Sequence, residues 1–232
     1  MSNLETFFTD AFENLTEKEE FYKAVFMNMN GAEAARLRSE YYRSKFKSCG
    51  KNFNIGVGVR ISHPECISVG DNVSICDDVT IVARGGTSEI NIGNDVNIMQ
   101  RVYLDTEHDD SVMNIGHDVY IGTGTTLFGH CGLDIGDNTL MAQNISLTPY
   151  SHIFEDPNNN IINQGGHTRK VTIGRDCYIG MNVTILYSAD IGDGSVVGSG
   201  AVVVKPLEPM SVAVGNPARV LRKRGEPKKN KE

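Results

Sequence analysis

The chain has 232 residues, of which 40% are hydrophobic and 22% are charged, and its formal net charge is −7. This acidic balance argues against a nucleic-acid partner, because nucleic-acid binders usually carry a basic domain. No apolar stretch reaches the roughly 18–20 residues that span a bilayer, and the first ten residues lack the basic start of a secretory signal, so we expect no membrane span.

Five cysteines lie at positions 49, 66, 76, 131 and 177, and no two of them form a Cys-x-x-Cys pair. The odd number and the spacing argue against a disulfide framework and against a zinc ribbon. We therefore expect reduced thiols in a cytoplasmic protein, each serving as a small buried hydrophobe.

The first fifty residues differ in composition from the rest of the chain. They are rich in Phe, Tyr, Glu, Lys and Arg, Thr16 to Glu19 match a capping box, and Gly50 can end a helix. We expect short helices near 4–14, 17–28 and 32–47. Residues 1–50 would form a helical cap over one end of the molecule or, alternatively, a lid. The expected apolar face consists of Phe7, Phe8, Phe12, Phe21, Tyr22 and Phe26.

From about Ile55 onward, an aliphatic residue returns at every sixth position, and Gly often follows it. A six-residue period is neither that of a helix nor a simple alternation. It is typical of a short strand and a turn, with one aliphatic side chain in a narrow core and Gly, Asn or Asp in the turn. Three hexapeptides make one triangular coil of 18 residues, so we predict a mainly β solenoid over residues 51–206. The longest unbroken run is Ile173, Ile179, Ile185, Ile191, Val197 and Val203.

Insertions interrupt this solenoid. Six segments begin with an aliphatic residue and Gly, and they are 23, 23, 20, 38 and 18 residues apart, which leaves insertions of 5, 5, 2, 20 and 0 residues. Insertions in solenoids usually gather on one face, and that face often binds the ligand. The segments begin at Val69, Ile92, Ile115, Ile135, Ile173 and Ile191.

The longest insertion covers residues 153–170 and directly follows His152. It is polar and too long for a tight turn, and long loops in compact folds are often functional. A neutral imidazole at this junction can accept a proton from a substrate hydroxyl. A single histidine in a loop is more often an ordinary surface residue, so the residues alone leave both interpretations open.

Three features make the chain similar to the hexapeptide-repeat acyltransferases, in particular the maltose and galactoside acetyltransferases. The first is the repeat itself. The second is a Gln-Asn-x-x-Leu coil, then His152, then an Ile-Gly-x-x-x-Tyr-Ile-Gly coil. The third is a Val-Gly-Ser-Gly-Ala-Val-Val-Val-Lys block followed by Ala-Val-Gly-Asn-Pro-Ala-Arg-Val-Leu-Arg. The matching segments are 143–147, 173–180, 197–205 and 213–222, within a resemblance that covers roughly residues 52–224.

The resemblance implies a left-handed parallel β-helix, although parallel crossovers are generally right-handed. It implies an enzyme that moves an acetyl group from acetyl-CoA to a hydroxyl of a sugar or polysaccharide precursor, with His152 as general base and no metal. It also implies a homotrimer whose active sites lie between neighbouring subunits.

The resemblance further implies which residues bind acetyl-CoA. Backbone groups of three residues would meet the thioester and the pantetheine arm, and three basic side chains would meet the phosphates, which favour Arg and Lys. Residues 207–232 would form a CoA-binding segment and a basic tail. The implied residues are Met181, Ser199 and Val204 for the arm, and Lys205, Arg219 and Arg222 for the phosphates.

The chain also departs from the family pattern. Val204 stands where the family has Thr, which removes one hydroxyl, and Gly129 and His130 stand where galactoside-type enzymes carry acidic residues near the acceptor. The acceptor sugar is therefore not defined by the resemblance. Candidate acceptor-binding residues are Asn144, Glu155 and Asp156.

Three other functions remain as alternatives. Acetylation of the amine of a nucleotide-linked amino sugar is the nearest, since a histidine base serves an amine equally well. A non-catalytic β-helix scaffold would need no CoA-type motif. A metal-dependent hydratase on the same fold would need three converging histidines, and the six histidines include no His-x4-His pair.

Overall fold

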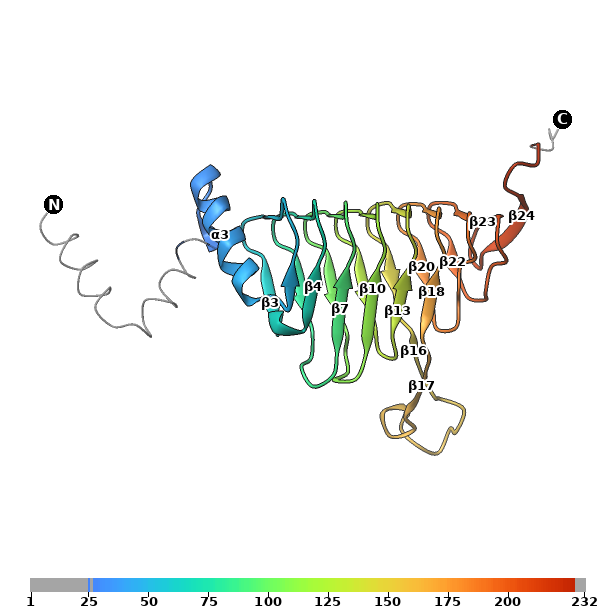
Figure 1. Cartoon of the computed structure of the whole chain (residues 1–232). Coiled ribbons are helices and arrows are strands. Elements are labelled where there is room, and N and C mark those ends of the chain that lie inside the picture. Colours follow the sequence, from blue (N-terminus) through green and yellow to red (C-terminus); the bar gives the residue numbers. More distant parts are fainter. Residues whose placement is uncertain (1–24, 26, 228–232) are drawn as a thin grey trace, which may run out of the picture.

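The computed structural model describes residues 25 and 27–227. The expected helix near 4–14, most of the one near 17–28, their apolar face and the last five tail residues lie outside the described residues. The described chain is a straight solenoid with a helix at its N-terminal end and a projecting hairpin near its C-terminal end (Figure 1). This architecture confirms the predicted β-helix.

Three parallel sheets form the walls of the solenoid, and we name them A, B and C in the order in which each coil visits them. Sheet A consists of β1 (Ser48–Cys49), β4 (Ile67–Val69), β7 (Glu89–Ile92), β10 (Val112–Ile115), β13 (Leu133–Ile135) and β18 (Val171–Ile173). Sheet B consists of β2 (Asn54–Ile55), β5 (Ser74–Ile75), β8 (Asn97–Ile98), β11 (Tyr120–Ile121), β14 (Leu140–Met141), β19 (Tyr178–Ile179), β21 (Val196–Val197), β23 (Ser211–Val214) and β24 (Arg219–Lys223). Sheet C consists of β3 (Arg60–Ser62), β6 (Thr80–Val82), β9 (Tyr103–Asp105), β12 (Thr126–Phe128), β15 (Ser146–Leu147), β20 (Thr184–Ile185) and β22 (Val202–Val203).

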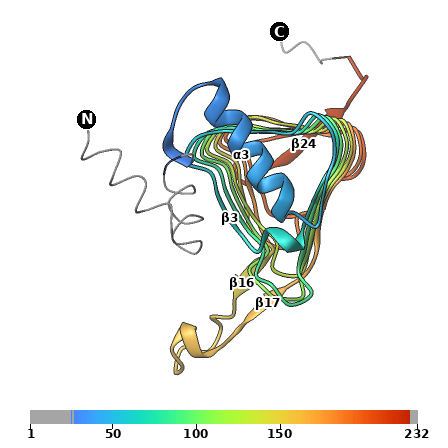
Figure 2. The same ribbon diagram turned by 60° about the vertical axis from the view of Figure 1, so that its left-hand side comes forward.

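The six-residue repeat corresponds to the core. In sheet B, Ile75 is in register with Ile98, Ile98 with Ile121, and Ile121 with Met141, and all four side chains are buried. Burying a side chain of this size contributes roughly 1.5–3 kcal/mol. The stacking of like side chains therefore aligns the coils and holds them together. Seen along the axis with α3 nearest, the coils superimpose as a triangle and wind left-handed (Figure 2).

All the insertions lie at one corner of the triangle, where sheet C passes to sheet A. The loops that follow β6, β9 and β12 gather there, and so does the hairpin after β15 (Figures 1 and 2). The expectation that the insertions share one face is confirmed. The longest one is more ordered than a loop, because β16 (Tyr150–His152) pairs antiparallel with β17 (Gly166–Thr168), and a short helix η2 (Ile161–Asn163) lies near its tip.

In the described part of the chain, a long helix lies over the first coil. Helix α3 (Ala32–Lys45) matches the helix expected near 32–47, and its buried Tyr42 begins a chain of ring contacts through Phe46 to Phe53. The expected role of Gly50 as its end is wrong. The helix ends at Lys45, and Gly50 follows β1, where a Cβ would lie 2.3 Å from the Asp71 carboxylate.

The remaining elements complete the two ends. A short helix η1 (Pro64–Cys66) fills the first insertion corner. At the C-terminal end, β24 turns back and pairs antiparallel with β23, which extends sheet B by one strand. Among the described residues, no helix is both long and apolar enough to cross a membrane.

Candidate functional site

The predicted site residues lie at two different corners of the solenoid. His152 lies at the corner between sheets C and A, together with Val204 and Lys205, which directly follow β22. Met181 and Ser199 lie at the corner between sheets B and C, two residues after the ends of β19 and β21. Sheet C separates the two groups, and its strands of two or three residues are up to roughly 10 Å long. A single chain therefore does not bring the two groups together.

His152 is exposed at the base of the hairpin. It pairs with Gly166 across the two hairpin strands. Its Nδ1 atom lies 3.5 Å from the hydroxyl of Tyr150, and the two rings meet edge to face with centroids 4.7 Å apart. The imidazole is thus accessible and is held from one side.

The two acidic candidates of the hairpin form local turn contacts. The backbone N–H of Phe154 donates to a carboxylate oxygen of Glu155 at 3.0 Å. The backbone N–H of Asn158 donates to Asp156 at 2.9 Å. Both carboxylates are exposed, and neither forms a hydrogen bond with His152 in the described chain. Their predicted role toward an acceptor stays a prediction.

A column of turn residues runs along the corner between sheets B and C, one from each coil. The backbone N–H of Met181 donates to the hydroxyl of Ser199 in the next coil at 3.1 Å. The equivalent residue one coil further is Gly215, which has no side chain to accept from the Ser199 N–H. Ser199 is exposed, so among the described residues its N–H is left for solvent or a ligand. Asn144 belongs to the same corner, where its positive φ of 57° closes a turn.

The two predicted arginines lie on β24. Arg219 is in register with Val214, at the end of the strand nearest the column of Met181 and Ser199. Arg222 is in register with Val212, and its guanidinium donates to the carbonyl oxygens of Lys223 and Glu226 at 3.1 and 3.0 Å. Arg219 is exposed and Arg222 half-buried at the C-terminal end of the column. Lys205 lies at the other corner, beside Val204.

Sequence reasoning missed two groups at the insertion corner. His130 and Tyr150 lie on neighbouring coils of the insertion corner, with their rings stacked and 5.0 Å between centroids. One coil earlier, the fully buried Asp105 accepts two hydrogen bonds from Arg84, at 2.9 and 2.6 Å. Burial and the Asp105 contact raise the pKa of Tyr103 to about 12. The spacings between the repeat segments could have indicated these groups, because they place residues that are 20–23 positions apart at the same corner.

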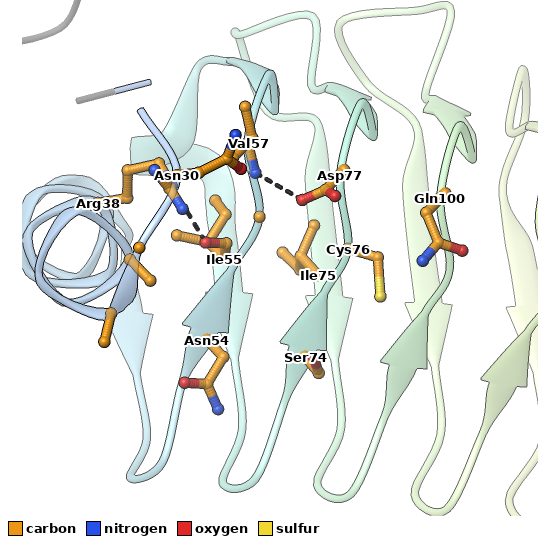
Figure 3. A pocket seen from close by; sticks show the side chains of 14 residues that line it. Asn30, Arg38, Asn54, Ile55, Val57, Ser74, Ile75, Cys76, Asp77 and Gln100 are labelled. Carbon is orange, nitrogen blue, oxygen red and sulfur yellow. Dashed lines mark hydrogen bonds between the residues drawn. The ribbon is translucent and has the colours of Figure 1, made fainter. Parts of the chain in front are cut away.

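A hollow of about 410 Å³ lies far from His152, between the start of α3 and the first coils of sheet B (Figure 3). Figure 3 shows Arg38 directed at the carbonyl oxygen of Ile55, and the Val57 N–H donating to Asp77. None of the predicted site residues lines this hollow. Among the described residues, no group of three or more His, Cys, Asp or Glu side chains could hold a metal ion.

Comparison with known proteins supports the resemblance. Residues 170–205 match the family model described as bacterial transferase hexapeptide (six repeats). The chain is 35% identical over 105 residues to the galactoside O-acetyltransferase of Escherichia coli, and the matched segment covers 44% of this chain and 50% of that protein. It is 36% identical over 104 residues to the probable acetyltransferase Rv3034c of Mycobacterium tuberculosis, covering 45% of this chain and 35% of that protein. The chain thus spans half or less of the length of these curated relatives.

Solved structures agree on the fold. The N-acyltransferase AntD of Bacillus cereus, in complex with dTDP and 3-hydroxybutyryl-CoA, matches with a TM-score of 0.58 at 22% identity, over 81% of this chain and 88% of that one. The polySia-specific acetyltransferase NeuO matches with a TM-score of 0.54 at 22% identity, over 82% and 93%. The sequence matches confirm the predicted resemblance to the hexapeptide-repeat acyltransferases, and these structures confirm its fold.

Proposed function

We propose that the protein transfers an acetyl group from acetyl-CoA to a hydroxyl of a sugar or polysaccharide precursor. The observation that carries the proposal is the position of His152, exposed at the corner where every insertion gathers. The names of the curated relatives, galactoside O-acetyltransferase among them, support it. So do the blocks at 197–205 and 213–222, which resemble the CoA-binding segments of that family.

The reaction follows from the chemistry of a neutral imidazole. His152 accepts the proton of the acceptor hydroxyl, and the hydroxyl oxygen attacks the thioester carbonyl in the same step. A backbone N–H stabilises the resulting oxyanion. When the carbon–sulfur bond breaks, the imidazolium returns its proton to the departing thiolate, so His152 ends the cycle neutral.

Acetyl-CoA would lie along the column at the corner between sheets B and C. The free N–H of Ser199 is suited to bind a carbonyl oxygen of the pantetheine arm. The N–H of Met181 would become available to acetyl-CoA once the Ser199 hydroxyl turns away from it. Val204 and Lys205 would approach from another chain. The guanidinium groups of Arg219 and Arg222 would bind the phosphates, for which Arg is well suited.

This arrangement requires more than one chain. His152 and Met181 lie at opposite edges of sheet C, so a complete site needs the His152 corner of one copy beside the Met181 corner of another. In a three-fold assembly with parallel solenoids, these corners become neighbours when sheet C faces the symmetry axis. We therefore propose a homotrimer with three sites between subunits. The five cysteines are all free thiols, which supports a reducing compartment such as the cytoplasm. The expectation that each is buried is wrong except for Cys177, since Cys131 is exposed and the other three are half-buried.

Calorimetric titration with acetyl-CoA tests the donor half of the proposal. We expect saturable binding of about one molecule per chain, weakened roughly 10-fold or more in Arg222→Ala, because a charge-assisted contact contributes about 1.5–3 kcal/mol in favourable cases. Absence of binding at millimolar acetyl-CoA would contradict the proposal.

A panel of glycosides, polysaccharide precursors and amino sugars, read out by thiol release, tests the acceptor half. We expect the hydroxyl acceptors to release CoA and His152→Ala to reduce the rate by 100-fold or more, since general bases contribute about 10²–10⁴-fold. Release with amino sugars alone would contradict O-acetylation.

A further inference from the structure

A row of rings leads across the insertion corner to His152. The ring of His108 meets that of His130 at 5.5 Å, His130 stacks on Tyr150 at 5.0 Å and 21°, and Tyr150 meets His152 at 4.7 Å and 81°. His108, His130 and Tyr150 come from three successive coils, and Tyr150 and His152 lie on the same strand, β16. The neighbouring Phe128 ring adds a contact to His130 at 6.1 Å. Tyr150 is therefore supported by a packed wall on the side away from His152.

The other support of Tyr150 is the hairpin backbone. A Cβ at Gly166 would lie 2.2 Å from both the Cζ and the hydroxyl oxygen of Tyr150. Gly166 does not have the positive φ that usually calls for glycine, so the reason for glycine here is the room that the tyrosine ring takes. Gly166 also pairs with His152 across the hairpin. The ring of Tyr150 thus lies between His130 and the strand that carries the partner of His152.

A general base needs a group that fixes its orientation and tautomer. That group is often a carboxylate, but Glu155 and Asp156 are engaged in the turns of the hairpin. Across residues 27–227, the hydroxyl of Tyr150 is the polar group that approaches a ring nitrogen of His152, at 3.5 Å. Catalytic hydrogen bonds are often this long before substrate binds, and they shorten in the complex.

We propose that Tyr150 is a positioning residue, held between His130 and Gly166, which orients the imidazole of His152 and selects its tautomer. This inference rests on the proposed function. The Nδ1–H of His152 donates to the Tyr150 oxygen, which leaves the lone pair of Nε2 for the proton of the acceptor. The opposite tautomer would carry its proton on Nε2 and could not act as a base there.

The stack with His130 is uncharged. Burial lowers the pKa of His130, and its Nδ1 atom is buried with no hydrogen-bond partner among the described residues. A neutral imidazole stacks on the phenol without placing a positive charge near His152, where such a charge would oppose formation of the imidazolium. The stack of His130 on Tyr150 therefore adds no positive charge beside His152.

Two variants remove the two parts of this arrangement. Tyr150→Phe keeps the ring and removes only the hydroxyl. Gly166→Ala keeps the hydroxyl but moves the ring, because the new Cβ overlaps it. Tyr41→Phe, which removes a tyrosine hydroxyl on α3 at the far end of the solenoid, is the matched control. Each is studied as the full chain.

The first readout is independent of transfer activity. Nitrogen-15 spectra of histidine-labelled protein report the tautomer and the pKa of His152, assigned with His152→Ala. We expect the Nδ1–H tautomer to dominate in the wild type and in Tyr41→Phe, and a mixture of tautomers in Tyr150→Phe. Equal tautomer populations in the wild type and in Tyr150→Phe would overturn the proposal, whatever the reaction.

The second readout is the rate of acetyl transfer. We expect kcat to fall about 10-fold in Tyr150→Phe, and about 100-fold in Gly166→Ala because small misplacements of a base are costly, with KM for acetyl-CoA unchanged. A wild-type chain that moves no acetyl group would refute the proposed function while the tautomer measurement still stands. A chain whose transfer depends on His152 but not on Tyr150 would refute the positioning role alone.

Discussion

His130 gains its properties from neighbours that are distant in sequence. It lies against rings from two other coils, and burial is the main cause that lowers its pKa below the ordinary value of 6.5. The nearby carboxylates of Glu107 and Asp105 act in the opposite direction, and His108 acts in the same direction. The folded chain therefore binds a proton at His130 less readily than the unfolded chain does.

This shift predicts a loss of stability in acid. Above pH 6.5 both states have a neutral His130 and the shift has no effect. As the pH falls below 6.5, the unfolded state takes up the proton first, so the free energy of unfolding decreases until the folded state is protonated too. His130→Phe keeps a ring in the stack and removes this dependence.

Thermal unfolding between pH 5 and 8 provides the measurement. We expect the melting temperature of the wild type to fall more on acidification than that of His130→Phe. His167→Phe, at an exposed position of the hairpin, is the control and should follow the wild type. Parallel curves for wild type and His130→Phe would show that His130 does not titrate differently in the two states.

At the scale of the element, a coil closes only if its turn backbones can touch those of the next coil. A Cβ at Gly93, which follows β7, would lie 2.5 Å from the carbonyl oxygen of Gly116 and 3.0 Å from the N–H nitrogen of His117. Those atoms belong to the backbone of the next coil and cannot move separately. The glycine is thus required by the distance between coils.

Gly93→Ala should therefore destabilise the protein by about 3 kcal/mol, the upper part of the range for overpacked sites. Gly165→Ala is the matched control, because its φ of 77° is strained for alanine but no atom lies within 4 Å of the new Cβ. We expect the control to cost about 1 kcal/mol. Denaturant midpoints at constant slope compare the two, and equal losses would show that contact between coils is not the cause.

The sequence predicts this fold well because its repeat has a direct physical cause. Ile98 and Ile121 are equivalent positions of the repeat because each occupies the same place in its coil. The numbers of extra residues between such equivalent positions identify the loops that gather at one corner. The end of α3 was harder to predict. In the sequence, Gly50 resembles a residue that ends a helix. Glycine is needed there because Asp71 of the next coil lies close to it, and only the stacked coils reveal this contact.

The site was predictable to the extent that it follows a motif. His152 stands at a recognisable junction, whereas Tyr150 and His130 have no such signal, because 20 residues separate them and only the stacking of coils brings their rings together. The motif also could not indicate that Met181 and His152 lie at different corners. That separation depends on which turn of the triangular coil each residue occupies.

At the scale of the whole molecule, the division of the site between two corners predicts the geometry of assembly. If the corners that flank sheet C meet across subunits, the outer face of sheet C is buried in the assembly. Its strands β12, β15 and β20 present small residues there, with Thr126 in register with Ser146, and Ser146 with Thr184. Such a face lets solenoids approach closely.

Thr184→Arg should therefore break the assembly, because it introduces a long charged side chain into that contact. We expect the mass measured by light scattering to fall from three times the 25.4 kDa chain to one. Acetyl transfer should fall with it, since each site would lose its second chain. Thr172→Arg makes the same change on the outer face of sheet A, where Thr172 is exposed, and should leave both mass and activity unchanged. If Thr172→Arg dissociates the protein and Thr184→Arg does not, sheet A rather than sheet C faces the axis, and the proposed pairing of His152 with Met181 of a neighbour is wrong.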